Sequence, residues 1–144
     1  LAQLESPQVV QVNLDTVSLA NSAHATAIGK SILAWLPDNE MARIVTQKGL
    51  AQFTPDTITN FDELTENLRL VRRFGYAMDR EEFLLGVASV GTALRDQSGT
   101  VLGSVSCTLP ASRADEKNIE DVAKAVLECV GKLSVKIGHS KAES

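Results

Sequence analysis

Residues 79–110 have the sequence DREEFLLGVASVGTALRDQSGTVLGSVSCTLP, and this stretch decides the fold. Its centre is Asp96-Gln97-Ser98-Gly99, a set of residue types that favours a tight turn, with a glycine that can adopt positive φ. On either side, β-branched and small residues alternate, and this two-residue period is typical of strands. The stretch therefore predicts two antiparallel strands joined by a short loop.

Each of the two predicted strands has two unlike faces. One side is mostly apolar and should pack against helices: Ala88, Val90, Thr92 and Leu94, with Val101, Gly103, Val105, Cys107 and Leu109. The other side carries small residues and hydroxyls: Val87, Ser89, Gly91 and Ala93, with Leu102, Ser104, Ser106 and Thr108. Such a face is either a sheet surface wetted by solvent or the floor of a small-molecule pocket. Spacing alone favours the solvated surface.

Composition sets the limits for the rest of the chain. Its 144 residues, 44% hydrophobic and 22% charged, suit one soluble globular domain. No apolar run approaches the roughly 20 residues of a membrane helix, and the first residues lack a signal-peptide pattern. A net charge of −4 argues against direct nucleic-acid binding by this chain. Two distant cysteines, Cys107 and Cys129, favour a reducing, cytoplasmic compartment over a disulfide framework.

Before the hairpin, the sequence predicts a strand followed by a buried helix. Residues 8–12 alternate as in a strand, which can extend to Leu14. A polar segment follows, and then Ile28, Ile32 and Leu36 recur at four-residue steps. This spacing predicts a buried helix that starts near Thr26 and ends before Pro37, because the residue before a proline avoids the helical region.

Two more helices complete the first half. Residues 37–48 should form a helix with Gly49 as its C-terminal cap. After an irregular connector, Asn60 should cap a helix that ends at Gly75. The predicted buried stripe of this helix is Phe61, Leu64, Leu68 and Val71.

The remaining elements are a short strand and a long helix. Tyr76-Ala77-Met78 should form a strand that leads into Asp79. After Pro110, apolar residues at three- and four-residue steps predict a helix over residues 115–137, closed by Gly138. A helix of this length should lie across the sheet or pair with a second copy of itself.

Three sequence features could carry catalytic chemistry, and none does so convincingly. Gly29-Lys30-Ser31 ends like a phosphate-binding loop, but the earlier glycine and the preceding strand of that motif are missing. Asp79 and the acids after it have no nucleophile, histidine or metal-ligand cluster at suitable spacing. Cys107 alternates onto an apolar face, which favours a buried structural thiol. We therefore expect no catalytic residue, no metal site and no cofactor.

An ordered set of motifs resembles the effector-binding domain of IclR-family bacterial transcriptional regulators. The motifs are His24-Ala25-Thr26-Ala27-Ile28-Gly29-Lys30-Ser31-Ile32-Leu33-Ala34, then Thr57-Ile58-Thr59 before a leucine-rich helix, then Arg73-Phe74-Gly75-Tyr76-Ala77-Met78-Asp79-Arg80-Glu81-Glu82, and Ser104-Val105-Ser106 with Pro110 and Arg113. The resemblance covers roughly residues 8 to 138. Each motif is weak alone, and the specificity lies in their order.

The resemblance implies an α/β fold of the α+β type, a GAF-like antiparallel sheet with helices on both faces. It also implies a sensory function, in which a small organic, sugar-derived or aromatic acid binds between the sheet and the opening helix. Binding would alter how a separate N-terminal winged helix-turn-helix domain holds DNA. Such regulators are usually dimers or tetramers. The family domain usually begins further upstream, so the resemblance also predicts that this chain lacks the start of that domain and has an open sheet edge.

Carried over position by position, the resemblance predicts a ligand site and reverses the preference for a solvated sheet face. The predicted ligand-binding residues are Ala27, Ile28, Asp79, Val87, Ser89, Ser106 and Thr108. The N–H groups near Ala27 and Ile28 would hold a carboxylate at the helix N-terminus. Asn21 is a weaker candidate in the preceding loop. Ser89 stands where the family often has cysteine, and Thr108 where serine is common.

Two other functions compete with ligand sensing. One is an enzyme that acts on a small carboxylic acid with Asp79 as its base. The other is a pure dimerisation module built on the long final helix.

Overall fold

The structure is a computed structural model, and it describes residues 9–13 and 21–143, with side chains from residue 21 to 134. Four strands form one antiparallel sheet in the order β1-β4-β3-β2. The strands are β1 (Val9–Asn13), β2 (Ala77–Arg80), β3 (Val87–Arg95) and β4 (Val101–Pro110). The predicted hairpin is thus confirmed as β3 and β4, and it forms the centre of the sheet.

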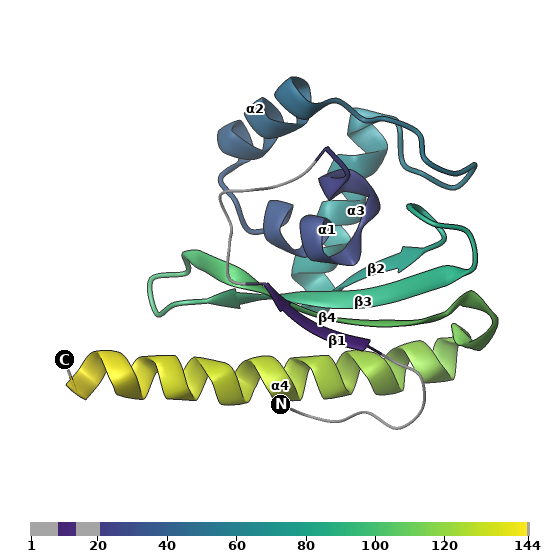
Figure 1. The fold of residues 1–144 in the computed structure, drawn as a ribbon. Coiled ribbons are helices and arrows are strands. Elements are labelled where there is room, and N and C mark those ends of the chain that lie inside the picture. The colour runs from purple at the N-terminus through teal and green to yellow at the C-terminus, as the bar shows by residue number, and fades with distance from the viewer. Residues whose placement is uncertain (1–8, 14–20, 144) are drawn as a thin grey trace.

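Helices cover both faces of this sheet (Figure 1). One face packs against the long helix α4 (Glu116–Glu143), and the other against α1 (Ala27–Leu33). Helix α3 (Phe61–Phe74) packs beside α1, and α2 (Asp38–Lys48) lies farther from the sheet. Two short 3₁₀ turns, η1 (Ala23–Ala25) and η2 (Ala111–Arg113), precede α1 and α4. The predicted α+β architecture is confirmed.

The apolar face of the hairpin forms the core with α4. Val90, Val105 and Leu109 are buried against Ile119 and Val126 of the helix. Cys107 and Cys129 are both free thiols in this cluster, and burial raises the pKa of the Cys107 thiol. The apolar stripe of α4 is therefore used within the domain, which confirms the first of its two predicted arrangements, packing across the sheet.

Val101 lies on the opposite face from the one predicted. The strand register shifts between Leu94 and Arg95: Leu94 pairs with Gly103, and Arg95 pairs with Val101. Leu102 is the extra residue of this bulge, and one extra residue reverses the faces on the far side of it. Val101 therefore packs with Ile32 and Ala93 under α1.

Several predicted helix boundaries change in detail. Helix α1 ends at Leu33 rather than Leu36, because the N–H groups of the residues just before Pro37 bond three residues back in a tighter turn. Helix α3 starts and ends as predicted at Asn60 and Gly75, although Phe61 is 41% exposed rather than part of the buried stripe. The predicted strand end at Leu14 falls outside the described residues.

Two further boundaries differ from prediction at the strand and helix that flank the hairpin. Asp79 lies inside β2 and pairs with Ser89, instead of following the end of the strand. Helix α4 continues through Gly138 to Glu143, since a glycine inside a helix costs only about 1 kcal/mol and does not by itself end it.

Candidate functional site

Strand register places three of the predicted residues in one row across the sheet. Asp79 of β2 pairs with Ser89 of β3, and Ser89 pairs with Thr108 of β4. The neighbouring row pairs Gly91 with Ser106. All five residues lie on the face opposite α4, because they alternate with residues of the α4 core.

Helix α1 approaches this face closely at Gly91. A Cβ atom built on Gly91 would lie 3.0 Å from the backbone carbonyl carbon and oxygen of Ala27. A side chain at position 91 would therefore push the start of α1 away from the sheet. Because Gly91 has no side chain, the backbone of Ala27 can pack directly over the Gly91–Ser106 row.

The first turn of α1 keeps two N–H groups available. The Gly29 N–H donates to Oγ1 of the capping residue Thr26 at 3.0 Å, and the Lys30 N–H donates to the Thr26 carbonyl. Within the described part of the chain, the N–H groups of Ala27 and Ile28 donate to no partner. These two donors are the ones that the family resemblance assigns to a carboxylate.

The hydroxyls of the face divide into structural and uncommitted groups. The Ser104 hydroxyl bonds the Thr92 carbonyl and lies 2.8 Å from the Ser31 hydroxyl of α1, so it fastens helix to sheet. Ser106 and Thr108 make no side-chain hydrogen bond to any described residue. Ser106 is buried and Thr108 is half-buried. Of these hydroxyls, the ones on Ser106 and Thr108 have bonding capacity left for a ligand.

Asp79 lies at the end of the row and is buried, with only 4% of the residue exposed. Its Oδ1 atom accepts a hydrogen bond from the Glu82 N–H at 2.8 Å, and its Oδ2 atom accepts one from the Ser89 hydroxyl at 3.4 Å. Burial raises the pKa of Asp79 to about 6, and the nearby Glu82 carboxylate adds to this effect, while Lys30 opposes it. This carboxyl can therefore gain or lose a proton near neutral pH.

A buried lysine beside Asp79 was not predicted as a site residue. Lys30 is fully buried, and its ammonium group donates to the Met78 carbonyl at 2.6 Å and to Oε1 of Glu82 at 2.8 Å. In the sequence, Lys30 appeared in a segment that ends like a phosphate-binding loop and in the family motif of residues 24–34, but neither gave it a role. A sequence signal was available: Lys30 lies between Gly29 and Ser31 in a short helix that was predicted to be buried, so its charge needed a buried partner.

Hydrogen bonds from the connector that precedes α3 hold the segment after β2 in place. Thr54 donates a hydrogen bond to the Glu81 carbonyl and Thr57 donates one to the Glu82 carbonyl. Glu81 adopts a positive φ of 55°, which is uncommon for a residue with a side chain. These bonds hold Glu82 where its backbone and side chain reach Asp79 and Lys30.

The remaining predicted residues lie at the margin of this arrangement. Val87 is half-buried and pairs with Pro110 at the end of the hairpin. Asn21 is exposed and lines a small cavity with His24 and Ile44, away from the sheet face. A cavity of about 670 Å³ lies elsewhere, between α2 and the β3–β4 turn, and none of the predicted residues lines it.

The described residues hold no cluster of three or more histidine, cysteine or acidic side chains suited to a metal ion. In the same part of the chain, no helix is long and apolar enough to cross a membrane. The groups that the site offers are two backbone N–H groups, two hydroxyls and one titratable carboxyl.

The sequence matches a known family of bacterial regulators. A family model described as the C-terminal region of the bacterial transcriptional regulator IclR matches residues 1–135. The chain belongs to this family, and the resemblance seen in the sequence is confirmed. The family consists of transcriptional regulators rather than enzymes, so the alternative of an enzyme with Asp79 as its base is not supported.

Particular relatives agree with this assignment. The HTH-type transcriptional repressor AllR of Escherichia coli K12 is 32% identical over 115 residues, which cover 80% of this chain and 42% of AllR. The crystal structure of IclR from Thermotoga maritima superimposes with a TM-score of 0.77 at 35% identity, over 81% of this chain and 47% of that one. The C-terminal domain of the Escherichia coli regulator KdgR gives a TM-score of 0.76 at 29% identity, over 81% and 71%. The chain thus spans less than half the length of the curated relatives it matches.

Proposed function

We propose that this chain is the effector-sensing domain of an IclR-type regulator and that it binds a small carboxylic acid under the N-terminus of α1. The observation that carries the proposal is the row Asp79–Ser89–Thr108, next to the Gly91–Ser106 row on which α1 packs. The first turn of α1 has two N–H donors without partners among the described residues. The proposal covers organic, sugar-derived and aromatic acids, since each offers one carboxylate and a polar or planar body. The regulator would act in the cytoplasm, bind DNA through a separate domain and assemble as a dimer or tetramer.

Each group in the site has a separate task in this proposal. The N–H groups of Ala27 and Ile28 hold the carboxylate of the ligand, since backbone donors at a helix start favour an anion. The hydroxyls of Ser106 and Thr108 hydrogen-bond the polar body of the ligand. Val87 closes the end of the floor with apolar contact. The carboxyl of Asp79 donates a hydrogen bond when protonated, which a pKa of about 6 permits near neutral pH.

The ligand reports to the rest of the protein through Glu82. A ligand that bonds Asp79 competes for the carboxyl oxygens that hold the Glu82 N–H and the Ser89 hydroxyl. Glu82 is also bonded by Thr57, from the connector between α2 and α3, and by Lys30, from α1. Ligand binding would therefore shift α1 and this connector together, and a DNA-binding domain or a second subunit could respond to that shift.

Isothermal titration calorimetry tests the proposed site directly. The wild-type chain is titrated at pH 5.5 with pyruvate, gluconate and benzoate, one acid from each chemical class. We expect at least one to bind with saturable heat, and Thr108→Tyr to abolish the heat of pyruvate or gluconate and to reduce that of benzoate, because the larger ring fills the floor beside Ser89. The matched control is Leu102→Tyr, a half-buried position on the same strand outside the row. Equal heat from the wild type and Thr108→Tyr would contradict the site.

A further inference from the structure

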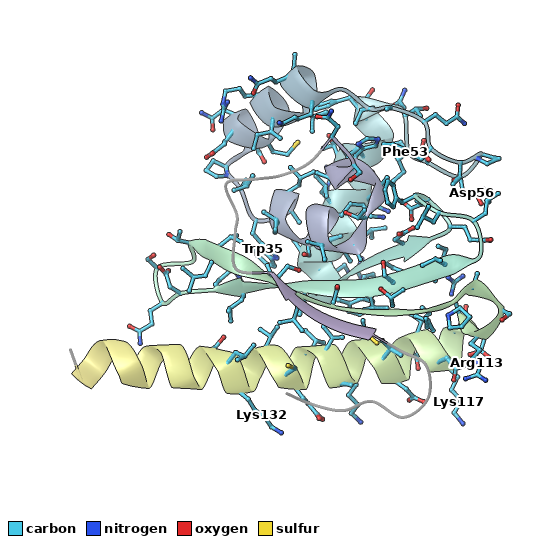
Figure 2. The ribbon with its side chains drawn as sticks, viewed as in Figure 1. Trp35, Phe53, Asp56, Arg113, Lys117 and Lys132 are labelled. Atoms are coloured by element: carbon cyan, nitrogen blue, oxygen red, sulfur yellow. The ribbon has the colours of Figure 1, made fainter. Side chains whose placement is uncertain are left out.

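The structure has a large cavity that the proposed sensing site does not use. It has a volume of about 670 Å³, within the range of roughly 300–1,000 Å³ that is typical of small-molecule sites. Its walls are the segment Trp35–Pro37, one face of α2, and residues 98–101 of the β3–β4 turn. Figure 2 shows Trp35 on the side of the sheet that carries α1, α2 and α3.

Helix α2 packs into the core with one face and lines the cavity with the other. Met41 and Val45 of α2 are buried in the core. The residues that line the cavity recur at steps of three and four along the same helix, and so share the other face: Glu40, Arg43, Ile44, Gln47 and Lys48. The cavity therefore lies between α2, whose other face is packed in the core, and the turn that joins β3 to β4.

The base of the cavity is apolar and includes a tryptophan ring in a fixed position. Trp35 packs with Ile32 and Val101, and Leu36 and Ile44 also line the cavity. The guanidinium carbon of Arg95 lies 3.6 Å from the centroid of the Trp35 ring. At this distance the cation attracts the face of the ring and restrains its orientation. A half-buried, oriented indole in a cavity favours a ligand with a planar apolar part.

The rim of the cavity is cationic, although the chain as a whole has a net charge of −4. Arg43 and Lys48 line it, and Glu40 is the opposing charge in the lining. Arg95 is not in the lining but lies over the Trp35 ring. The Arg43–Glu40 pair is long, at 3.9 Å, and both side chains are about half exposed or more. Lys48 and Arg95 form no ion pair within the described residues. An excess of positive charge over an apolar base suits an amphiphilic anion.

We propose that this cavity is a second binding site, separate from the sensing site, for a planar aromatic carboxylate. The ring of the ligand packs against Trp35, Ile44 and Val101, and its carboxylate pairs with Arg43 and Lys48. The ligand is bound without any covalent step. The proposal does not depend on the proposed sensing function, because the two sites share no residue.

The chain contains a single tryptophan, and Trp35 lines this cavity, so its indole N–H gives one NMR signal from the wall of the proposed site. The experiment adds 2-naphthoate to the ¹⁵N-labelled chain and follows that signal. We expect a saturable shift, and no comparable shift with 2-naphthalenemethanol, which has the same ring system without the charge. The double variant Arg43→Gln/Lys48→Gln should weaken naphthoate binding by about tenfold or more, because it removes both charge-assisted partners.

Two control variants show whether naphthoate binding depends on this cavity in particular. Lys117→Gln/Lys132→Gln removes the same charge from the side of α4 that points away from the sheet (Figure 2), and we expect it to bind naphthoate as the wild type does. Thr108→Tyr, in the sensing site, should also leave the indole shift unchanged. The proposal is overturned by no saturable shift, by an equal shift with the alcohol, by unchanged affinity in the Arg43/Lys48 variant, or by loss of the shift in Thr108→Tyr.

Discussion

The ammonium group of Lys30 lies 2.8 Å from Oε1 of Glu82, and the lysine side chain is fully buried. Glu82 retains 13% exposure of its side chain and sits one hydrogen bond away from Asp79. The pair connects α1, the edge strand β2 and the segment that follows it. Because burying a charge is costly unless it is paired, we expect this contact to stabilise the packing of α1 on the sheet.

Lys30→Met should destabilise the domain by about 3 kcal/mol, because it leaves Glu82 without its cation and the Met78 carbonyl without its donor. Urea unfolding measures the change. Arg69→Met is the matched control, since Arg69 pairs with Glu66 on the surface of α3 and should lose less than about 0.5 kcal/mol. Similar losses in the two variants would mean that the buried pair contributes no more to the free energy of unfolding than the exposed pair does. Adding Glu82→Gln to Lys30→Met should recover part of the loss.

The raised pKa of Asp79 makes stability depend on pH. Between its unfolded value of 3.8 and its folded value of about 6, the folded protein holds a proton that the unfolded chain has released. Stability from this group is therefore full below about pH 4, falls as pH rises through about 6, and is level above that. The difference is on the order of 3 kcal/mol.

Asp79→Asn tests this dependence because it keeps an oxygen acceptor for the Glu82 N–H and cannot ionise. The variant should gain stability relative to the wild type as pH rises from about 4 to about 7, the window set by the raised pKa. Taking the difference between the two proteins at each pH cancels the titration of all other acids. A difference that stays constant over this range would show that the folded-state pKa of Asp79 is not raised.

Gly91→Ala should lower stability by about 1–3 kcal/mol, because the added methyl group would meet the Ala27 backbone at 3.0 Å. The opposite result is expected at Gly131, an exposed glycine of α4 with open space around its Cβ position. There, alanine should stabilise the domain by up to about 1 kcal/mol. Thermal and urea unfolding of both variants give the comparison. A tolerated alanine at position 91 would contradict close packing of α1 on the sheet.

Carboxylate binding should weaken as pH rises through about 6, the folded-state pKa of Asp79. Above this pH Asp79 is ionised, and its charge repels the ligand, with Glu82 adding to the repulsion and Lys30 reducing it. The affinity should then fall by up to about tenfold per pH unit, and binding at neutral pH should take up a proton. Calorimetry in buffers with different ionisation enthalpies measures that uptake. Affinity that is flat across this titration would rule out a role for the Asp79 proton.

The sequence predicted the hairpin and both caps of α3 because these depend on local signals, whereas the sheet with helices on both faces was predicted from the family resemblance. The turn at Asp96–Gly99, the cap at Asn60 and the glycine at position 75 each act within a few residues of themselves. The face that carries Ser89 and Thr108 also followed from simple alternation. Where alternation was interrupted, at Leu102, the prediction placed Val101 on the wrong face.

The parts of the site that were missed depend on contacts between distant residues. Lys30 and Glu82 are 52 residues apart, and no local pattern indicates that they meet. The ties from Thr54 and Thr57 to the segment after β2 span 27 and 25 residues. Likewise, the extension of β2 through Asp79 depends on pairing with β3, which turns a predicted loop acid into a buried strand residue.

A crystal structure of the chain with the acid that binds most tightly in the calorimetric panel tests the proposed sensing site most directly. We predict that the carboxylate of that acid lies within hydrogen-bonding distance of the Ala27 and Ile28 N–H groups, with its body over Ser89 and Thr108. Asp79 should contact it from the end of the row. An acid bound only elsewhere on the domain, with none over Ser89 and Thr108, would contradict the central claim.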